Sequence, residues 1–188
     1  GDGVITVTNS GTLRGNLDVQ GTLTNSGTIE LAHNAMDEDS AYIKNFTNDE
    51  HGILRIGLLT KGSLENTTYS QLNTESATFE NGSTINVNVL SASTNSGLLA
   101  GNKLADVVTA SGTLTDNGLV VTDNSALLNF QKVVTEGANG KIDLNVVQAQ
   151  TVSEAVTKIS TKAAPTQYAN AQGAAKATSS AFDKMASI

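Results

Sequence analysis

The sequence has no cysteine, a single proline, few aromatic residues and no long apolar run. Without cysteine the chain has neither a disulfide framework nor a thiolate metal site. One proline leaves nearly every backbone N–H group able to donate in a β-ladder, as a protein of many strands requires. No apolar run approaches the ~18 residues of a transmembrane helix, so we expect no membrane-spanning helix.

Basic residues are also scarce, with 11 Lys and Arg against 18 Asp and Glu and a formal net charge of −7. They are scattered along the chain, whereas binding to a phosphate backbone requires basic patches, so we expect no nucleic-acid partner. Aromatic residues make up 4% of the 188 residues and hydrophobic residues 38%. This composition favours a thin, elongated core of Leu, Ile and Val over a globular centre.

What the chain does have is a short recurring pattern of glycine, a polar residue and one aliphatic residue. It occurs as Gly11-Thr12-Leu13, Gly15-Asn16-Leu17, Gly21-Thr22-Leu23 and Gly27-Thr28-Ile29, and Asn-Ser-Gly precedes the first and last of these. Gly and Asn tolerate the positive φ of tight turns, and Thr suits a pleated surface. Strands this short cannot bury their own apolar side chains, so the units must stack as a solenoid.

Apolar pairs two residues apart indicate which side of each strand faces the core. Ile5/Val7, Leu17/Val19 and Ile29/Leu31 each place both side chains on one face and recur 12 residues apart. The later strands are spaced irregularly, as expected when the connecting loops differ in length. We assign residues 1–97 to stacked rungs of this solenoid, and because the pattern is already under way at Gly1 we expect the chain to be part of a longer protein.

A β-hairpin is predicted near the end of the patterned region. Residues 127–135 and 141–148 flank the linker Glu136-Gly137-Ala138-Asn139-Gly140, whose Asn-Gly step is a hairpin signal. Packed across the end of the solenoid, it would cover the last rung and shield the ladder edge. We assign residues 98–150 to this cap. Its folding nucleus is expected to consist of Leu114, Leu119, Val121, Leu128, Phe130, Ile142, Leu144 and Val146.

The pattern changes to that of an α-helix after residue 150. Thr151-Val152-Ser153-Glu154 matches a capping box, in which the Thr hydroxyl and the Glu carboxylate pair with N–H groups of the first turn. An apolar stripe follows at helical spacing, formed by Val152, Ala155, Val156 and Ile159. We therefore assign residues 151–188 to a helical linker, although Gly173 and the weak apolarity of its second half also allow a frayed tail.

Several segments in this order resemble the C-terminal part of a Gram-negative autotransporter passenger of type V secretion. The resemblance lies in Ala77-Thr78-Phe79 with Gly82-Ser83-Thr84-Ile85-Asn86-Val87, in residues 99–110 and 123–130, and in Gly140-Lys141-Ile142-Asp143-Leu144-Asn145-Val146. The Ala-rich residues 170–185 resemble the segment that leads to the translocator barrel. Two-partner secreted adhesins share the Gly-Thr-Leu and Asn-Ser-Gly rungs, but the hairpin and the helix favour the autotransporter.

This resemblance implies an all-β fold, a right-handed parallel β-helix with a C-terminal autochaperone hairpin, followed by a short α-helical segment. It implies a non-enzymatic structural and folding module, which nucleates β-helix folding during secretion and forms the stem. The implied partner is the protein's own C-terminal outer-membrane β-barrel translocator, absent from this chain. The implied location is the cell surface or the medium, reached through the periplasm and outer membrane. The alternative is an adhesin or self-association fragment that contacts another copy or a host surface.

Residues that could carry chemistry are few. His33 and His51 are the only histidines, and neither zinc-site spacing nor a nucleophile elbow accompanies them. The acidic residues Asp37-Glu38-Asp39 and Asp49-Glu50 offer oxygen ligands to a hard cation such as Ca²⁺, but charge runs are usually solvated faces. We expect no catalytic residues, no metal site and no cofactor.

Overall fold

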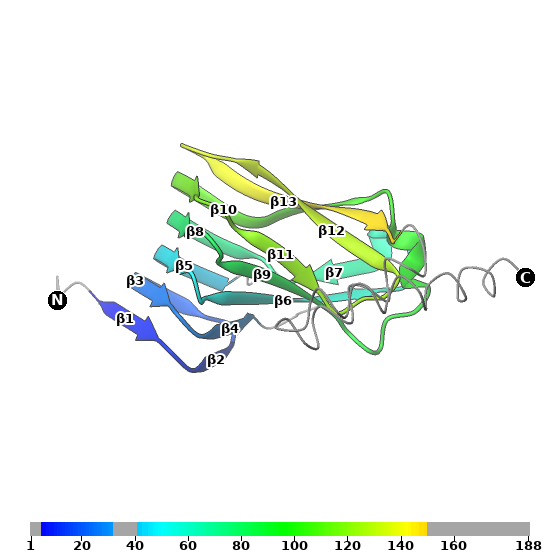
Figure 1. The fold of residues 1–188 in the computed structure, drawn as a ribbon, viewed down its shortest axis with the longest axis horizontal. Helices are drawn as coiled ribbons and strands as arrows, with labels where there is room; N and C mark the ends of the chain where they lie inside the picture. Colours follow the sequence, from blue (N-terminus) through cyan, green and yellow to red (C-terminus); the bar gives the residue numbers. More distant parts are fainter. Residues whose placement is uncertain (1–4, 32–40, 150–188) are drawn as a thin grey trace, which may run out of the picture.

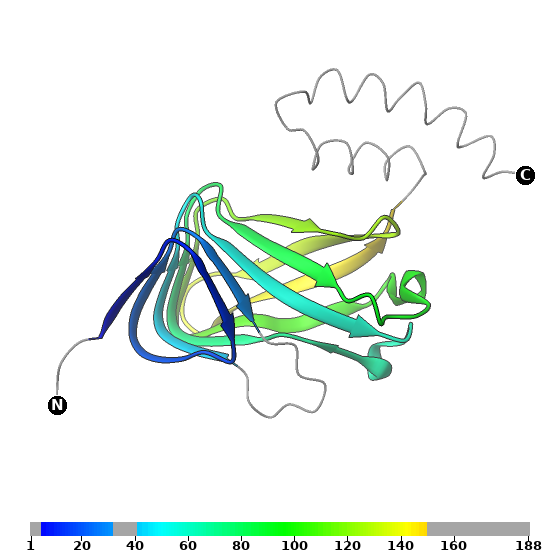
Figure 2. The ribbon, with the colours of Figure 1, turned by 90° about the horizontal axis from the view of Figure 1, so that it is seen from below.

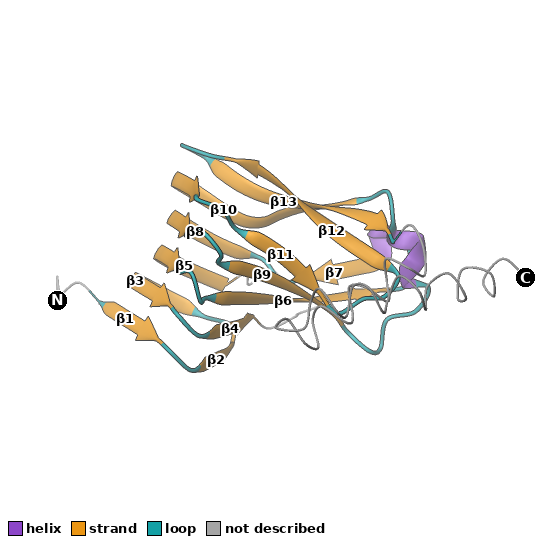
Figure 3. Ribbon diagram, viewed as in Figure 1, coloured by secondary structure: helices purple, strands orange, loops and turns teal. Residues whose placement is uncertain are grey.

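In the computed structural model, which describes residues 5–31 and 41–149, the chain is all-β and its strands form two sheets (Figures 1 and 3). The chain passes back and forth between them, and each passage contributes one strand to each sheet. We call such a pair of strands a rung. The five rungs are β1 (Thr6–Asn9) with β2 (Thr12–Gly15), β3 (Asp18–Asn25) with β4 (Thr28–Leu31), β5 (Ala41–Asn48) with β6 (Ile53–Thr60), β8 (Leu72–Phe79) with β9 (Thr84–Val89), and β10 (Lys103–Asp116) with β11 (Val120–Asp123).

Successive rungs pair in parallel in both sheets. The first sheet has the order β1-β3-β5-β8-β10-β13-β12 and the second β11-β9-β6-β4-β2. The short strand β7 (Thr67–Tyr69) pairs antiparallel with β6, and two 3₁₀ turns lie at Leu64–Asn66 and Ser96–Leu99. In Figure 2 the two sheets meet along the edge formed by the short turns and spread apart on the opposite side.

The spacing between rungs is irregular and is not the 12 residues that separate the apolar pairs of the sequence. Equivalent positions lie 16 residues apart between the first two rungs, as Asn9 and Asn25 show, and 23 apart between the next two. They lie 31 and then 36 residues apart in the later rungs. The 12-residue spacing of the apolar pairs joins residues that are not register partners: Val7 pairs with Leu23, and Val19 with Ile43.

The core consists of columns of aliphatic and aromatic side chains that run through the stack. In the second sheet one such column joins Leu13, Ile29, Leu54, Ile85 and Val121 through register pairs. In the first sheet the corresponding column joins Val7, Leu23, Phe46, Ala77 and Leu114. These columns belong to one continuous apolar cluster that extends from the first rungs to Val146. Each rung therefore buries its apolar side chains against the rungs before and after it.

The predicted hairpin is present, formed by β12 (Leu128–Thr135) and β13 (Gly140–Gln148). Phe130 pairs with Val146 and Val134 with Ile142, as the alternation of apolar residues indicates. Strand β13 also pairs antiparallel with β10, the last parallel strand of its sheet. The hairpin thus covers the edge that β10 would otherwise expose. The predicted linker helix, with Val152, Ala155, Val156 and Ile159, lies outside the described residues.

Candidate functional site

The eight apolar residues predicted to form the folding nucleus lie together in the core near the C-terminal end of the stack. Seven are buried, and Val121 is partly buried against them. They come from β10, β11, β12 and β13 and from the turn that holds Leu119. They are therefore placed to join the last parallel rung to the hairpin; their role in folding stays a prediction.

Strands β10 and β13 change register where the parallel rungs meet the hairpin. Leu104 pairs with Leu144 and Val108 with Ile142, so three residues of β10 lie opposite the single residue Asp143. This is a β-bulge, and Asp106 at its centre has a φ of 56°. A bulge of this kind frees backbone N–H and C=O groups from the ladder, and each of them needs another partner.

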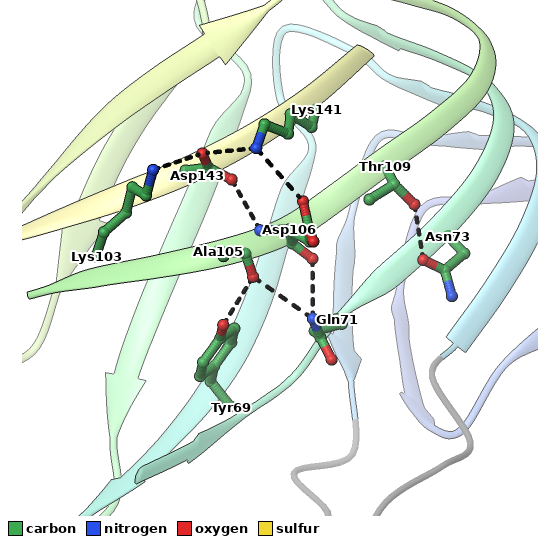
Figure 4. A network of polar contacts seen from close by, with 9 residues as sticks. All are labelled: Tyr69, Gln71, Asn73, Lys103, Ala105, Asp106, Thr109, Lys141 and Asp143. Carbon is green, nitrogen blue, oxygen red and sulfur yellow. Dashed lines mark hydrogen bonds and ion pairs between the residues drawn. The ribbon is translucent and has the colours of Figure 1, made fainter. Parts of the chain in front are cut away.

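Polar side chains supply these partners (Figure 4). The Asp106 N–H donates to Asp143 Oδ1 at 2.8 Å. The Ala105 carbonyl accepts from the Tyr69 hydroxyl at 2.7 Å, and the Asp106 carbonyl accepts from Gln71 Nε2 at 3.3 Å. Strand β7, Gln71 just before β8, and strand β13 thereby hold the bulge from both sides.

Asp143 is the charged centre of this junction, and its side chain is only 3% exposed. Its Oδ2 atom lies 3.6 Å from Lys103 Nζ and 3.4 Å from Lys141 Nζ, and Lys141 Nζ also lies 3.9 Å from Asp106 Oδ1. Two ammonium groups and one N–H group thus compensate the burial of this carboxylate.

Burial, assisted by the charges of Asp106 and Asp143, raises the pKa of the Tyr69 phenol, which therefore stays a hydrogen-bond donor.

The junction was not foreseen from the sequence. Alternation along β13 places Asp143 on the side opposite Ile142 and Leu144, where a carboxylate would normally face water. Its burial depends on the bulge in β10, which is 37 residues distant along the chain. The flanking Lys141 is the only local sign that this aspartate has a charged partner.

A second buried polar feature lies inside the stack beside the turns. Asn9, Asn25 and Asn48 occupy the same register position in three successive rungs. Asn9 Nδ2 donates to Asn25 Oδ1, and Asn25 Nδ2 donates to Asn48 Oδ1, both at 2.9 Å. In the next rung Phe79 takes this position, and its ring meets that of Phe46 edge to face with centroids 5.8 Å apart. This asparagine ladder fixes the register of the first three rungs.

Of the residues considered for chemistry, the structure describes Asp49, Glu50 and His51. His51 is exposed and lies 3.3 Å from Glu50. Asp49 accepts hydrogen bonds from the Ser26 hydroxyl and the His51 N–H; the Ser26 bond, followed by others, lowers its pKa. Across residues 5–31 and 41–149 no three His, Asp or Glu side chains gather as metal ligands would. Asp37, Glu38, Asp39 and His33 lie outside the described residues.

No protein-family model, curated protein or solved structure matches the sequence. In the part of the chain that the structure describes, no helix is both long and apolar enough to cross a bilayer.

Proposed function

We propose that the chain is a right-handed parallel β-helix forming the C-terminal end of an autotransporter passenger stem, with a non-enzymatic role in structure and folding. The observation that carries this proposal is the strand order: parallel pairing through every rung, then one antiparallel strand, β13, on the last of them. A stack that grows by identical contacts needs a different structure at the end where growth stops.

In this proposal the hairpin and the last rung fold first and provide the edge on which the other rungs assemble. Each added rung gains the same contacts with a preformed neighbour, so secretion from one end of the chain is coupled to folding. The junction around Asp143 supports this role because it ties β13 to β10 through backbone, side-chain and charge contacts together. The partner would be the protein's own outer-membrane translocator barrel, and the site of folding the outer cell surface.

Folding kinetics of two matched variants test the order of assembly. Leu144→Ala in β13 and Ile29→Ala in β4 each remove a fully buried aliphatic side chain and should each destabilise the protein by about 2–5 kcal/mol. If the hairpin region nucleates folding, Leu144→Ala slows refolding, whereas Ile29→Ala mainly accelerates unfolding. Slower refolding for Ile29→Ala, with an unchanged refolding rate for Leu144→Ala, would place the folding nucleus in the first rungs and contradict the proposal.

Surface display of the full-length protein in Gram-negative cells tests the location. We expect residues 5–149 to be accessible to protease added to intact cells. Leu144→Asp should leave the passenger stalled or degraded, because a charge in the core prevents the terminal rung from packing. Wild-type protein retained in the cytoplasm would contradict the proposal.

The adhesin alternative predicts concentration-dependent association of the purified chain in sedimentation.

A further inference from the structure

The outward face of the first sheet carries an ordered array of hydroxyl groups. One column of outward positions is threonine in all five rungs: Thr8, Thr24, Thr47, Thr78 and Thr115. The column two residues earlier contains Thr6, Thr22, Asn45, Ser76 and Thr113. The residues between the two columns are the apolar core column that contains Leu23 and Phe46. We call these ten outward residues the threonine grid.

The grid is regular because its register is unbroken. The shifts between the parallel strands of this sheet fall between Val19 and Thr22 and between Ala110 and Thr113, both before the grid begins. Neighbouring rungs are therefore spaced by about 4.8 Å, and the two columns lie about 6.6 Å apart along the strands, as the pleat of a parallel sheet dictates. The hydroxyl groups thus form a two-dimensional lattice.

These groups are available to a ligand. The threonines of the grid are exposed or half-buried. None of the eight threonine hydroxyls bonds to protein within the described residues, and the one internal bond of the grid joins the Ser76 hydroxyl to Asn45 Oδ1 at 2.8 Å. Threonine is stiff at χ1 because it is branched at Cβ, so the array is preorganised and loses little entropy on binding.

The ten grid residues carry no charge, although the chain has a net charge of −7. The exposed charges next to the grid on the same strands, Lys44 and Glu75, pair with each other at 3.9 Å. A nucleic acid or an acidic partner would find no cation in it, and a sugar ring would find no aromatic platform. A second copy of this chain would bring the same net negative charge towards it. What suits the grid is a neutral ligand that repeats in two dimensions and both donates and accepts hydrogen bonds.

We propose that the threonine grid binds ice. The prism face of hexagonal ice repeats in two directions: one repeat is close to the rung spacing of the grid, and the other is somewhat longer than its column spacing. Each hydroxyl can take the place of a lattice water, and each methyl group orders the water beside it. The proposal depends only on the register of the first sheet and is independent of the function proposed above.

Freezing-point hysteresis and partition of the purified full chain into a growing ice surface test this proposal. The wild-type protein should show hysteresis and enrichment in the ice fraction, whereas Thr24→Lys, which places a strongly hydrated ammonium in the grid, should lose most of both. Thr28→Lys is the matched control, because Thr28 is a half-buried outward residue of the same rung on the other sheet. It should behave as wild type.

Circular dichroism of each variant shows that the fold is retained. Folded wild-type protein that is excluded from ice and shows no hysteresis would overturn the proposal. Equal losses for Thr24→Lys and Thr28→Lys would also overturn it, because the effect would then not belong to the grid. Sedimentation of a dimer that Thr24→Lys abolishes, without any ice binding, would assign the grid to self-association instead.

Discussion

Replacing Asn25 with alanine tests whether the asparagine ladder holds the early rungs in register. Asn25 is fully buried, and its Nδ2 donates to Asn48 Oδ1 at 2.9 Å and to the carbonyls of Gly27 and Ile53 at 3.1 and 3.2 Å. Its Oδ1 accepts from Asn9 Nδ2 and from the Gly27 N–H. The side chain is thus bonded to three rungs at once.

The expected loss follows from what the substitution leaves unpaired. In Asn25→Ala the buried Asn48 Oδ1 loses its donor, and an unsatisfied buried group costs about 1–3 kcal/mol. The four other lost hydrogen bonds contribute about 0.5–1.5 kcal/mol each, so we expect a total of about 3–9 kcal/mol. Asn9→Ala is the control: it removes the four hydrogen bonds of the Asn9 side chain, which contribute about 0.5–1.5 kcal/mol each, for a total of about 2–6 kcal/mol. It carries no added penalty at the next asparagine, because Asn25 Oδ1 keeps the Gly27 N–H.

Urea unfolding followed by far-ultraviolet circular dichroism measures both free energies. Asn25→Asp should be worse than Asn25→Ala, because a carboxylate cannot donate to the three oxygens that the amide contacts. The reasoning is refuted if Asn25→Ala is no more destabilising than Asn9→Ala, since the bonds of Asn25 to the third rung would then add nothing to what Asn9 contributes at the edge of the stack.

Three further predictions concern the turns, the junction and the response to acid. Gly27→Ala should destabilise by at least about 1–3 kcal/mol in urea, because its Cβ would lie 2.2 Å from the Gly11 carbonyl, whereas Gly11→Ala meets nothing within 4 Å and should have little effect. Asp143→Ala leaves the Asp106 N–H and two lysines without their acceptor and should cost about 3–5 kcal/mol, whereas Lys103→Ala, at a half-exposed position, should cost less than about 1 kcal/mol. Burial would raise the pKa of Asp116, but hydrogen bonds from Lys132 and the N–H groups of Leu119 and Gly118 outweigh it, so the pKa lies below its usual value. The contribution of Asp116 is therefore complete above the unfolded pKa of about 3.9 and is lost as pH falls through the folded value, so urea midpoints of wild type should fall more steeply below about pH 4 than those of Asp116→Asn.

The sequence predicted most of the local structure because each turn and each strand is encoded by a pattern of a few neighbouring residues. The Asn-Ser-Gly turns join β1 to β2 and β3 to β4, and the Asn139-Gly140 step lies in the hairpin turn. The spacing of the rungs could not be derived in the same way, because apolar pairs identify a strand but do not identify which strand lies beside it. Register depends on loop length, and only the asparagines at 9, 25 and 48 mark it in the sequence.

The junction around Asp143 could not be predicted because its parts meet only in the folded chain. A bulge in β10 brings together Lys103, Asp106 and Asp143, and no local residue pattern predicts this bulge. Sequence alternation alone would leave Asp143 in water. The threonine grid is the opposite case, since its hydroxyls were visible in the sequence, and only their alignment across five rungs required the structure.

The two ends of the stack differ in what they offer to a further strand. At the first rung β1 and β2 are edge strands, and nothing lies within 4 Å of the position that a Cβ on Gly11 would occupy. Among the described residues, the side-chain oxygen Oδ1 of Asn9 accepts a hydrogen bond only from the Gly11 N–H. An incoming rung with asparagine at the ladder position would find both the space and the acceptor that Asn9 finds at Asn25. At the other end Lys132, in β12, pairs with Asp116 at 2.8 Å and donates to the Leu119 carbonyl. A charged edge of this kind resists strand addition to the first sheet. Strand β11 remains the outer strand of the second sheet, so the hairpin and Lys132 close this end on the first sheet alone, whereas both strands of the first rung are outer strands.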